Sequence, residues 1–164
     1  MNFSNRVISM QSSPIRKLVP YSTAAKEWGL KVYHLNIGQP DIKTPKSFFD
    51  AINNFNSDVL EYAVSQGLPE LIEEMINYYS TYDIDFKKDE ILITNGGSEA
   101  LLFAMMATCD PGDNILVPEP FYTNYNGFSS CINVCVKPIT THPEEGFHLP
   151  KKEDIVSKID KNTK

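Results

Sequence analysis

From residue 90 onward the chain alternates short apolar runs with a helix-length segment. The runs EILIT (90–94) and NILV (114–117) flank the segment SEALLFAMMATC (98–109), which a DPGD turn (110–113) closes. Neither run alternates apolar with polar residues, and the helical segment is apolar on every side. Strands and helices of this kind are typical of a parallel sheet covered on both faces. The sequence therefore predicts a βαβ unit and an α/β fold.

Proline, glycine and apolar spacing predict the elements on either side of this unit. Proline and glycine positions indicate a helix over 13–29 that Pro20 bends, a strand over 32–37 and a helix from Thr44. Apolar residues at the i, i+3, i+4, i+7 spacing predict a further helix that begins at Pro69. Towards the end of the chain we expect a helix over 121–130, a strand over 132–136 and an amphipathic helix over 151–159.

The last predicted helix has no strand after it. In an α/β chain a crossover helix returns the backbone to a further parallel strand, yet only residues 160–164 follow the helix at 151–159. We therefore expect an incomplete, mostly parallel sheet with covering helices. We also expect the chain to be the N-terminal part of a longer protein.

Length, charge and cysteine content exclude several classes of protein. The 164 residues suffice for one ordinary domain, and 21 acidic against 15 basic residues give a net charge of −6, which argues against binding to nucleic acid or to an anionic membrane. No apolar run approaches the roughly 18 residues of a membrane span. Three cysteines without zinc-site spacing predict no metal site and favour a reducing compartment, so we expect the cytoplasm.

The loop that joins the run 90–94 to the following helix is rich in glycine. Gly96 and Gly97 let the backbone turn sharply and approach a ligand, while the helix start offers free N–H groups and the positive end of its dipole. These features suit a phosphate. The same residues also fit a plain turn in which Ser98 caps the helix, and Glu99 would repel a phosphate if its carboxylate pointed inward. Both interpretations stay open at this point.

A second candidate lies where the run NILV ends in the residues PEPFY (118–122). The carboxyl ends of parallel strands meet at the edge where ligands of α/β folds bind, so we expect Tyr122 beside the glycine loop. An anion site next to an aromatic ring suits a ligand with a phosphate and a flat ring. Packing is the alternative role for Tyr122 and for four other aromatic residues, Tyr62, Phe121, Tyr125 and Phe128.

Three segments together resemble the class I/II aminotransferases, pyridoxal-phosphate enzymes of the aspartate aminotransferase fold (fold type I). The segment ITNGGSEALLFAMMATCDPGDNILVPEPFYTNYNGF (93–128) is similar to the cofactor-binding part of that family. LNIGQPDIKTP (35–45) resembles the pattern L-x-x-G-[EQ]-P-D-x-x-T-P, and EYAVSQGLPELIEEM (61–75) resembles Y-x-x-x-x-G-x-x-x-L. The similarity runs in family order from about residue 13 to about residue 160.

The resemblance implies a domain division and an activity. Residues 1–44 would form the N-terminal arm and a small-domain segment, and residues 45–164 the N-terminal part of the large cofactor-binding domain. The full-length protein would be a cytoplasmic homodimer that moves an amino group between an amino acid and a 2-oxo acid. A carbon–sulfur lyase of the same fold, or a non-catalytic module or inactive fragment, remains an alternative, because the substrate contacts that separate these functions lie downstream.

The resemblance also assigns the cofactor contacts. Gly97 would hold the phosphate through its backbone N–H, Ser98 through its hydroxyl, and Glu99 through its backbone. Tyr122 matches the aromatic residue that stacks on the pyridine ring of pyridoxal phosphate. These four residues, together with Tyr62, are the predicted cofactor-binding residues.

Two further positions match residues outside that loop. Gly38 matches the glycine whose backbone N–H meets the substrate α-carboxylate, and Tyr62 matches the tyrosine that crosses a dimer interface to reach the neighbouring subunit's phosphate. No lysine in the chain matches the family's Schiff-base lysine, which we expect downstream. We therefore expect no catalytic residue in these 164 residues, and no transamination by them alone.

Overall fold

The computed structural model describes residues 2–11 and 13–164, which form two units. Unit 1 combines the described residues up to Lys31 with Asn95–Lys164, and unit 2 is Val32–Thr94. The domain boundary between residues 44 and 45 stays a prediction.

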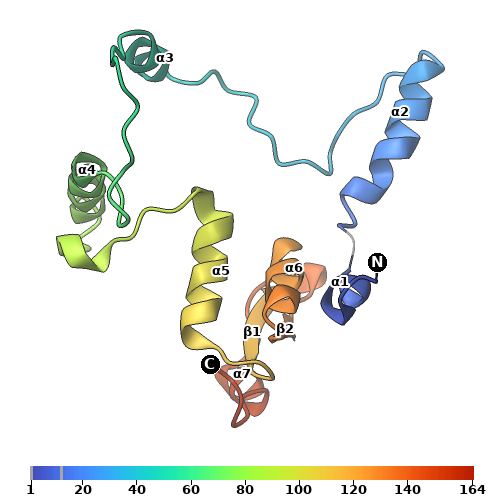
Figure 1. The fold of residues 1–164 in the computed structure, drawn as a ribbon. Helices are drawn as coiled ribbons and strands as arrows, with labels where there is room; N and C mark the ends of the chain where they lie inside the picture. Colours follow the sequence, from blue (N-terminus) through green and yellow to red (C-terminus); the bar gives the residue numbers. More distant parts are fainter. Residues whose placement is uncertain (1, 12) are drawn as a thin grey trace. The chain divides into compact units, whose positions relative to one another are not determined.

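Unit 1 contains a parallel sheet of two strands (Figure 1). β1 (Asn114–Glu119) pairs with β2 (Cys135–Thr140), and α6 (Asn124–Cys131) forms the crossover between them. The register runs from Asn114 opposite Cys135 to Glu119 opposite Thr140. The predicted α/β class and the parallel sheet are therefore confirmed.

The remaining helices of unit 1 come before β1 or after β2 in the sequence. The predicted helix over 13–29 is present, but as a 3-10 turn followed by an α-helix, and Pro20 lies in the first turn of that helix rather than at a bend. Proline fits there because the first turn leaves its N–H positions unpaired. The helices of unit 1 other than α6 are α1 (Asn5–Ser9), η1 (Arg16–Leu18), α2 (Val19–Glu27), α5 (Gly96–Thr108), η3 (Pro143–Glu145) and α7 (Lys152–Ser157).

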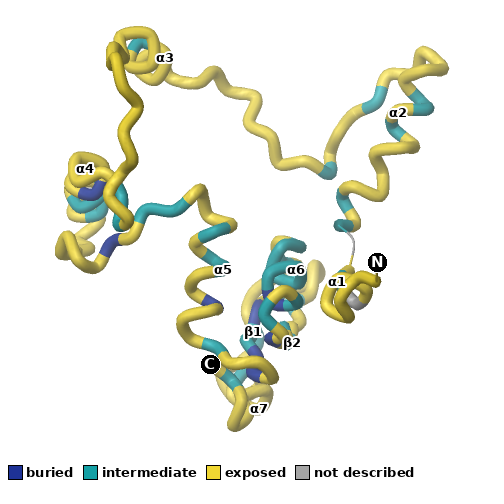
Figure 2. The backbone as a smooth tube through the Cα atoms, viewed as in Figure 1, coloured by how far each residue is buried: buried dark blue, intermediate teal, exposed yellow. Residues whose placement is uncertain are grey.

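The buried residues of unit 1 lie on or directly before the strands and on the helices beside them (Figure 2). Met105 on α5, Val117 on β1 and Ile139 on β2 are all at most 9% exposed, as is Val134 just before β2. Helix α6 contacts both α5 and β2. These apolar contacts hold the crossover against the sheet.

Unit 2 consists of α3 (Lys46–Asn53), α4 (Pro69–Ser80) and η2 (Lys88–Glu90). The helices predicted from Thr44 and from Pro69 are confirmed. α4 turns the side chain of Ile72 inward, where it is 4% exposed. Within residues 2–11 and 13–164, no helix is long and apolar enough to cross a membrane.

Two predicted strands are absent. Residues 32–37 form irregular chain with a turn, and residues 91–94 are extended without a strand beside them. In the second segment Ile93 N donates to the carbonyl oxygen of Gln66 at 2.8 Å, and Gln66 Nε2 donates to the carbonyl oxygen of Ile91 at 2.9 Å. Gln66 thus takes the hydrogen bonds that a neighbouring strand would take. The βαβ unit predicted over 90–117 is therefore wrong, and β1–α6–β2 takes its place.

The second strand also lies further along the chain than the predicted 132–136. Asn133 has a φ of +58°, in the left-handed region, and Val134 N donates to the carbonyl oxygen of Ser129 at 2.9 Å. Residues 132–134 therefore complete the end of α6. The strand can begin only after this turn, at Cys135.

The last residues of the chain lie beside the amino end of β1. Asn114 N donates to the carbonyl oxygen of Asn162 at 2.9 Å, and Lys164 N donates to the carbonyl oxygen of Asn114 at 3.1 Å. This is a single parallel bridge between Asn114 and Thr163. It occupies the edge of β1 that does not face β2.

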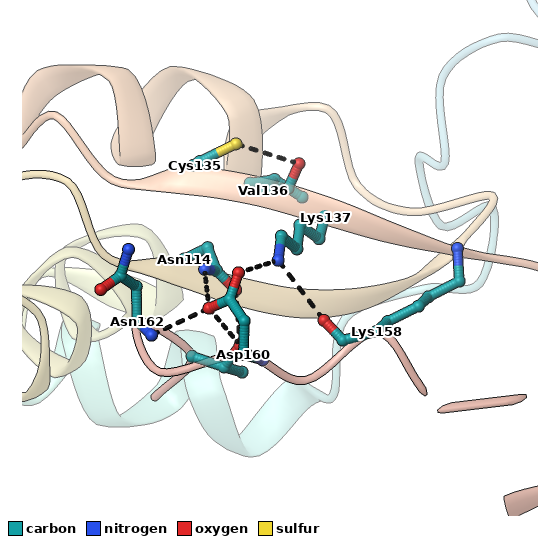
Figure 3. Close-up of polar contacts among 8 residues, drawn as sticks. Asn114, Cys135, Val136, Lys137, Lys158, Asp160 and Asn162 are labelled. Atoms are coloured by element: carbon teal, nitrogen blue, oxygen red, sulfur yellow. Dashed lines mark hydrogen bonds and ion pairs between the residues drawn. The ribbon is translucent and has the colours of Figure 1, made fainter. Parts of the chain in front are cut away.

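A group of polar side chains around Asp160, here called the Asp160 clasp, holds this segment (Figure 3). One carboxylate oxygen of Asp160 accepts from Asn114 Nδ2 at 3.0 Å and from Asn162 N at 2.8 Å, and the other accepts from Lys137 Nζ. Thr163 Oγ1 donates to Asn114 Oδ1 at 2.8 Å. The Lys137 ammonium, with the hydrogen bonds from Asn114 and Asn162, holds the pKa of the Asp160 carboxyl well below its ordinary value.

Candidate cofactor site

The glycine loop ends where α5 begins. Asn95 is the N-cap residue, and Gly96, with a φ of +77°, is the first residue of the helix. A φ in this range favours glycine because a side chain would be strained there. Ser98 is the third helical residue, so it does not cap α5 and the capping interpretation does not hold.

The first turn of α5 leaves several donors unpaired. Within the described part of the chain, the N–H groups of Gly97 and Ser98 and the hydroxyl of Ser98 have no hydrogen-bond partner. A Cβ placed on Gly97 would meet no atom within 4 Å. The backbone at Gly97 is therefore open to the approach of a ligand.

The side chain of Glu99 folds back onto the same helix start. Its Oε2 accepts a hydrogen bond from Asn95 N at 2.6 Å, and the residue is half-buried. We expected Glu99 to act through its backbone, and the sequence did not indicate this contact. A carboxylate at a helix N-terminus is stabilised by the free N–H groups and the dipole.

Tyr122 follows the carboxyl end of β1 and is 54% exposed. Asn124 Nδ2 donates to Tyr122 Oη at 2.7 Å, and Tyr125 N donates to the carbonyl oxygen of Tyr122 at 3.1 Å. The ring is thus held in place while about half of its surface stays accessible. Asn124 could not be singled out from the sequence, because an asparagine two residues after an aromatic residue carries no motif of its own.

The end of β1 is tied to β2 just before Tyr122. Thr140 Oγ1 donates to Glu119 Oε1 at 2.8 Å, and Thr141 Oγ1 donates to the carbonyl oxygen of Glu119. Phe121 and Tyr125 pack edge to face with ring centroids 6.1 Å apart. Tyr122 therefore projects from a segment fixed on both sides.

Connectivity brings the helix start and Tyr122 to one end of unit 1. α5 leads into β1 through the short turn at 109–113, so the two elements run in opposite directions (Figure 1). The start of α5 and the carboxyl end of β1 consequently lie at the same end of the unit. This is the end where ligands of open α/β sheets bind.

Two of the predicted residues lie in unit 2. The side chain of Tyr62 is fully exposed, and a Cβ placed on Gly38 would meet no atom within 4 Å. Their assigned roles toward a neighbouring subunit and a substrate stay predictions. Among the residues that the structure describes, no three His, Cys, Asp or Glu side chains gather to hold a metal ion.

Unpaired donors at a helix start and a half-exposed aromatic ring after a parallel strand are groups of an α/β protein that could hold a phosphate and a flat ring. The family model described as "Aminotransferase class I and II" matches residues 31–164, so the chain belongs to this family. It is 31% identical to a probable aspartate aminotransferase of Methanocaldococcus jannaschii over 94% of this chain and 40% of that protein. It is 29% identical to an aspartate aminotransferase of Pyrococcus horikoshii over 98% of this chain and 40% of that protein.

Solved structures agree with this relationship. An alanine aminotransferase from Pyrococcus furiosus superposes with a TM-score of 0.87 at 32% identity, covering 99% of this chain and 42% of that one. A single mutant of the Thermus thermophilus aspartate aminotransferase gives a TM-score of 0.88 at 28% identity, covering 100% of this chain and 43% of that one. The chain spans about two fifths of the length of these relatives. The predicted family and fold type are confirmed.

Proposed function

We propose that the protein, in its full-length form, is a pyridoxal-phosphate-dependent aminotransferase that moves an amino group between an amino acid and a 2-oxo acid. One observation carries the proposal: unpaired donors at the start of α5 share one end of unit 1 with the half-exposed ring of Tyr122. Class I and II aminotransferases use pyridoxal phosphate, and the family match over residues 31–164 includes both features.

The residues at the start of α5 fit a phosphate group. The N–H groups of Gly97 and Ser98 and the Ser98 hydroxyl are available to donate, and the missing side chain at Gly97 gives the phosphate room. Tyr122 offers a flat face for the pyridine ring, and Asn124 keeps that face oriented. When bound, pyridoxal phosphate supplies an electron sink for chemistry at the α-carbon of an amino acid.

Gly38 and Tyr62 complete the proposed contacts. We assign the Gly38 N–H to the substrate α-carboxylate and the exposed Tyr62 hydroxyl to the phosphate in a neighbouring subunit. The second assignment requires a homodimer. Three free cysteines support a cytoplasmic location, because they persist in a reducing compartment.

The names of the relatives favour amino-group transfer over carbon–sulfur cleavage. Those of M. jannaschii, P. horikoshii and P. furiosus reported above are all described as aminotransferases. A further M. jannaschii relative, 34% identical over 76% of this chain, is described as a (5-formylfuran-3-yl)methyl phosphate transaminase. We therefore place aminotransferase first.

Binding of pyridoxal phosphate and of unphosphorylated pyridoxal, measured by calorimetry, tests the proposal. We expect pyridoxal phosphate to bind at least tenfold more tightly, because each hydrogen bond to a charged group contributes about 1.5–3 kcal/mol. Inorganic phosphate should compete with it. Equal affinities for the two compounds would contradict a phosphate site. Release of a thiol from a cysteine conjugate by the full-length protein, without amino-group transfer, would favour the lyase instead.

A further inference from the structure

The carboxylate of Glu99 lies at the helix start that the proposed function assigns to the cofactor phosphate. Its Oε2 is 2.6 Å from Asn95 N and accepts that hydrogen bond. α5 is 13 residues long, and the N–H groups of Gly97 and Ser98 in its first turn have no partner in the described chain. Glu99 takes the donor at Asn95, while those at Gly97 and Ser98 remain for a ligand.

The helix start is the main compensation for the charge of Glu99. In the part of the chain that the structure describes, no lysine or arginine forms an ion pair with Glu99. A bound phosphate would use the neighbouring N–H groups of Gly97 and Ser98 and would share the same helix dipole. Two anions within one helical turn repel each other, and partial burial of Glu99 limits the screening of that repulsion by solvent.

We propose that Glu99 is an internal anion that sets the affinity of this site for phosphate. It occupies the helix start through the Asn95 N–H and opposes the charge of an incoming phosphate, so the loop binds its cofactor less tightly than its donors alone would allow. This inference rests on the proposed function. It gives the Glu99 side chain a role that a backbone contact alone would not have.

A glutamine at this position separates charge from hydrogen bonding. Its amide oxygen can still accept from Asn95 N, but the negative charge is gone. We expect Glu99→Gln to bind both inorganic phosphate and pyridoxal phosphate roughly tenfold more tightly than the wild type, the scale of one nearby like charge in a partly solvated site. The gain should shrink as the salt concentration rises, because salt screens the repulsion.

The experiment is calorimetric titration of wild type, Glu99→Gln and Glu99→Ala with inorganic phosphate, pyridoxal phosphate and pyridoxal at low and high salt. Glu153→Gln is the matched control, because Glu153 also lies in the first turn of a helix of unit 1, on α7. The control should leave all three affinities unchanged. Thermal melting of each variant without ligand checks that the start of α5 still folds.

The outcomes separate this inference from the proposed function. Tighter phosphate binding by Glu99→Gln, with unchanged pyridoxal binding, supports the inference. Phosphate-dependent binding by the wild type with equal or weaker binding by Glu99→Gln overturns the inference and leaves the proposed function standing. If glutamine retains the wild-type affinity and only alanine lowers it, Glu99 positions the loop and does not set its charge. Failure of every variant to distinguish pyridoxal phosphate from pyridoxal overturns the phosphate site itself.

Discussion

The polar groups near the two ends of β1 differ in whether they have hydrogen-bond partners. At the amino end the side chain of Asn114 is 4% exposed, and both of its polar atoms are paired, one with Asp160 and one with Thr163. At the end of unit 1 where β1 finishes, Ser98 and Gly97 keep unpaired donors in the described chain, and Tyr122 is half-exposed. Buried polar groups are normally paired, so the paired groups at the amino end stabilise the fold. Exposed donors at the other end are free for a ligand.

This difference separates stability from binding within one unit. A substitution in the Asp160 clasp should change the free energy of unfolding and leave ligand affinity alone. A substitution of Gly97 or Ser98 in the first turn of α5 should do the reverse.

Gly97→Val should abolish most of the affinity for pyridoxal phosphate. The valine side chain meets no atom of the chain within 4 Å of its Cβ, but it blocks the approach of the phosphate. We expect a loss of about 3 kcal/mol or more, since two hydrogen bonds to a charged group are removed. Equilibrium titration measures it.

Gly96→Ala is the matched control for that variant. Because Gly96 has a φ of +77°, alanine there should cost about 1–2 kcal/mol of stability through backbone strain. Urea denaturation of both variants compares them. Unchanged cofactor affinity in Gly97→Val would mean that no ligand approaches this backbone.

Asn114→Ala should lower the free energy of unfolding by about 1–3 kcal/mol, because it leaves Asp160 and Thr163 without their buried partner. Affinity for pyridoxal phosphate should stay the same. Asn162→Ala is the control, since Asn162 joins the clasp through its backbone and is exposed. Its effect should stay within about 0.5 kcal/mol. Equal losses in the two variants would show that the side chain of Asn114 adds nothing to the clasp.

Tyr122→Ala should weaken pyridoxal phosphate binding by about 1 kcal/mol, the contribution of an aromatic pair beyond burial. Tyr122→Phe should have a much smaller effect, because it keeps the ring and loses only the hydrogen bond from Asn124. Spectroscopic titration of the two variants distinguishes them. If both variants bind the cofactor with the affinity of the wild type, the Tyr122 ring packs against protein and does not stack on a ligand.

The pH dependence of stability should reveal the clasp. The pKa of Asp160 is depressed in the folded protein, so its contribution is present above the unfolded carboxyl pKa of about 3.9 and is lost as the pH falls below it. Asp160→Asn lacks this contribution at every pH. The difference in melting temperature between wild type and variant should therefore shrink between pH 7 and pH 3. A constant difference would contradict a stabilising charge at Asp160.

Local sequence signals predicted the helices better than the strands. The helix at Pro69 begins as expected because its apolar spacing and its N-terminal proline lie within the helix itself. A strand needs a partner elsewhere in the chain, and the segments at 32–37 and 91–94 lack one in the described structure. The left-handed conformation of Asn133, which delays the start of β2, was also missed, because asparagine tolerates several conformations.

In the candidate site and the Asp160 clasp, too, features set by nearby residues could be predicted and contacts between distant residues could not. Gly97, Ser98 and Tyr122 could be proposed from the sequence because glycine at a helix start and an aromatic residue at a strand end follow from local order. The contacts of Asn114 with Asp160 could not, since these residues are 46 positions apart and meet only through folding. The sequence did not indicate whether the Glu99 carboxylate points inward. In the structure it accepts a hydrogen bond from Asn95 N at the helix start.

Ser98→Ala tests the central claim most directly, with affinity and stability measured on the same variant. Ser98 has a hydroxyl without a partner in the described chain and does not cap α5. We predict that pyridoxal phosphate affinity falls roughly ten- to hundredfold, for a lost hydrogen bond of about 1.5–3 kcal/mol, while the melting temperature without ligand stays unchanged. A lower melting temperature with an unchanged dissociation constant would contradict the account, because Ser98 would then serve the helix and not a ligand.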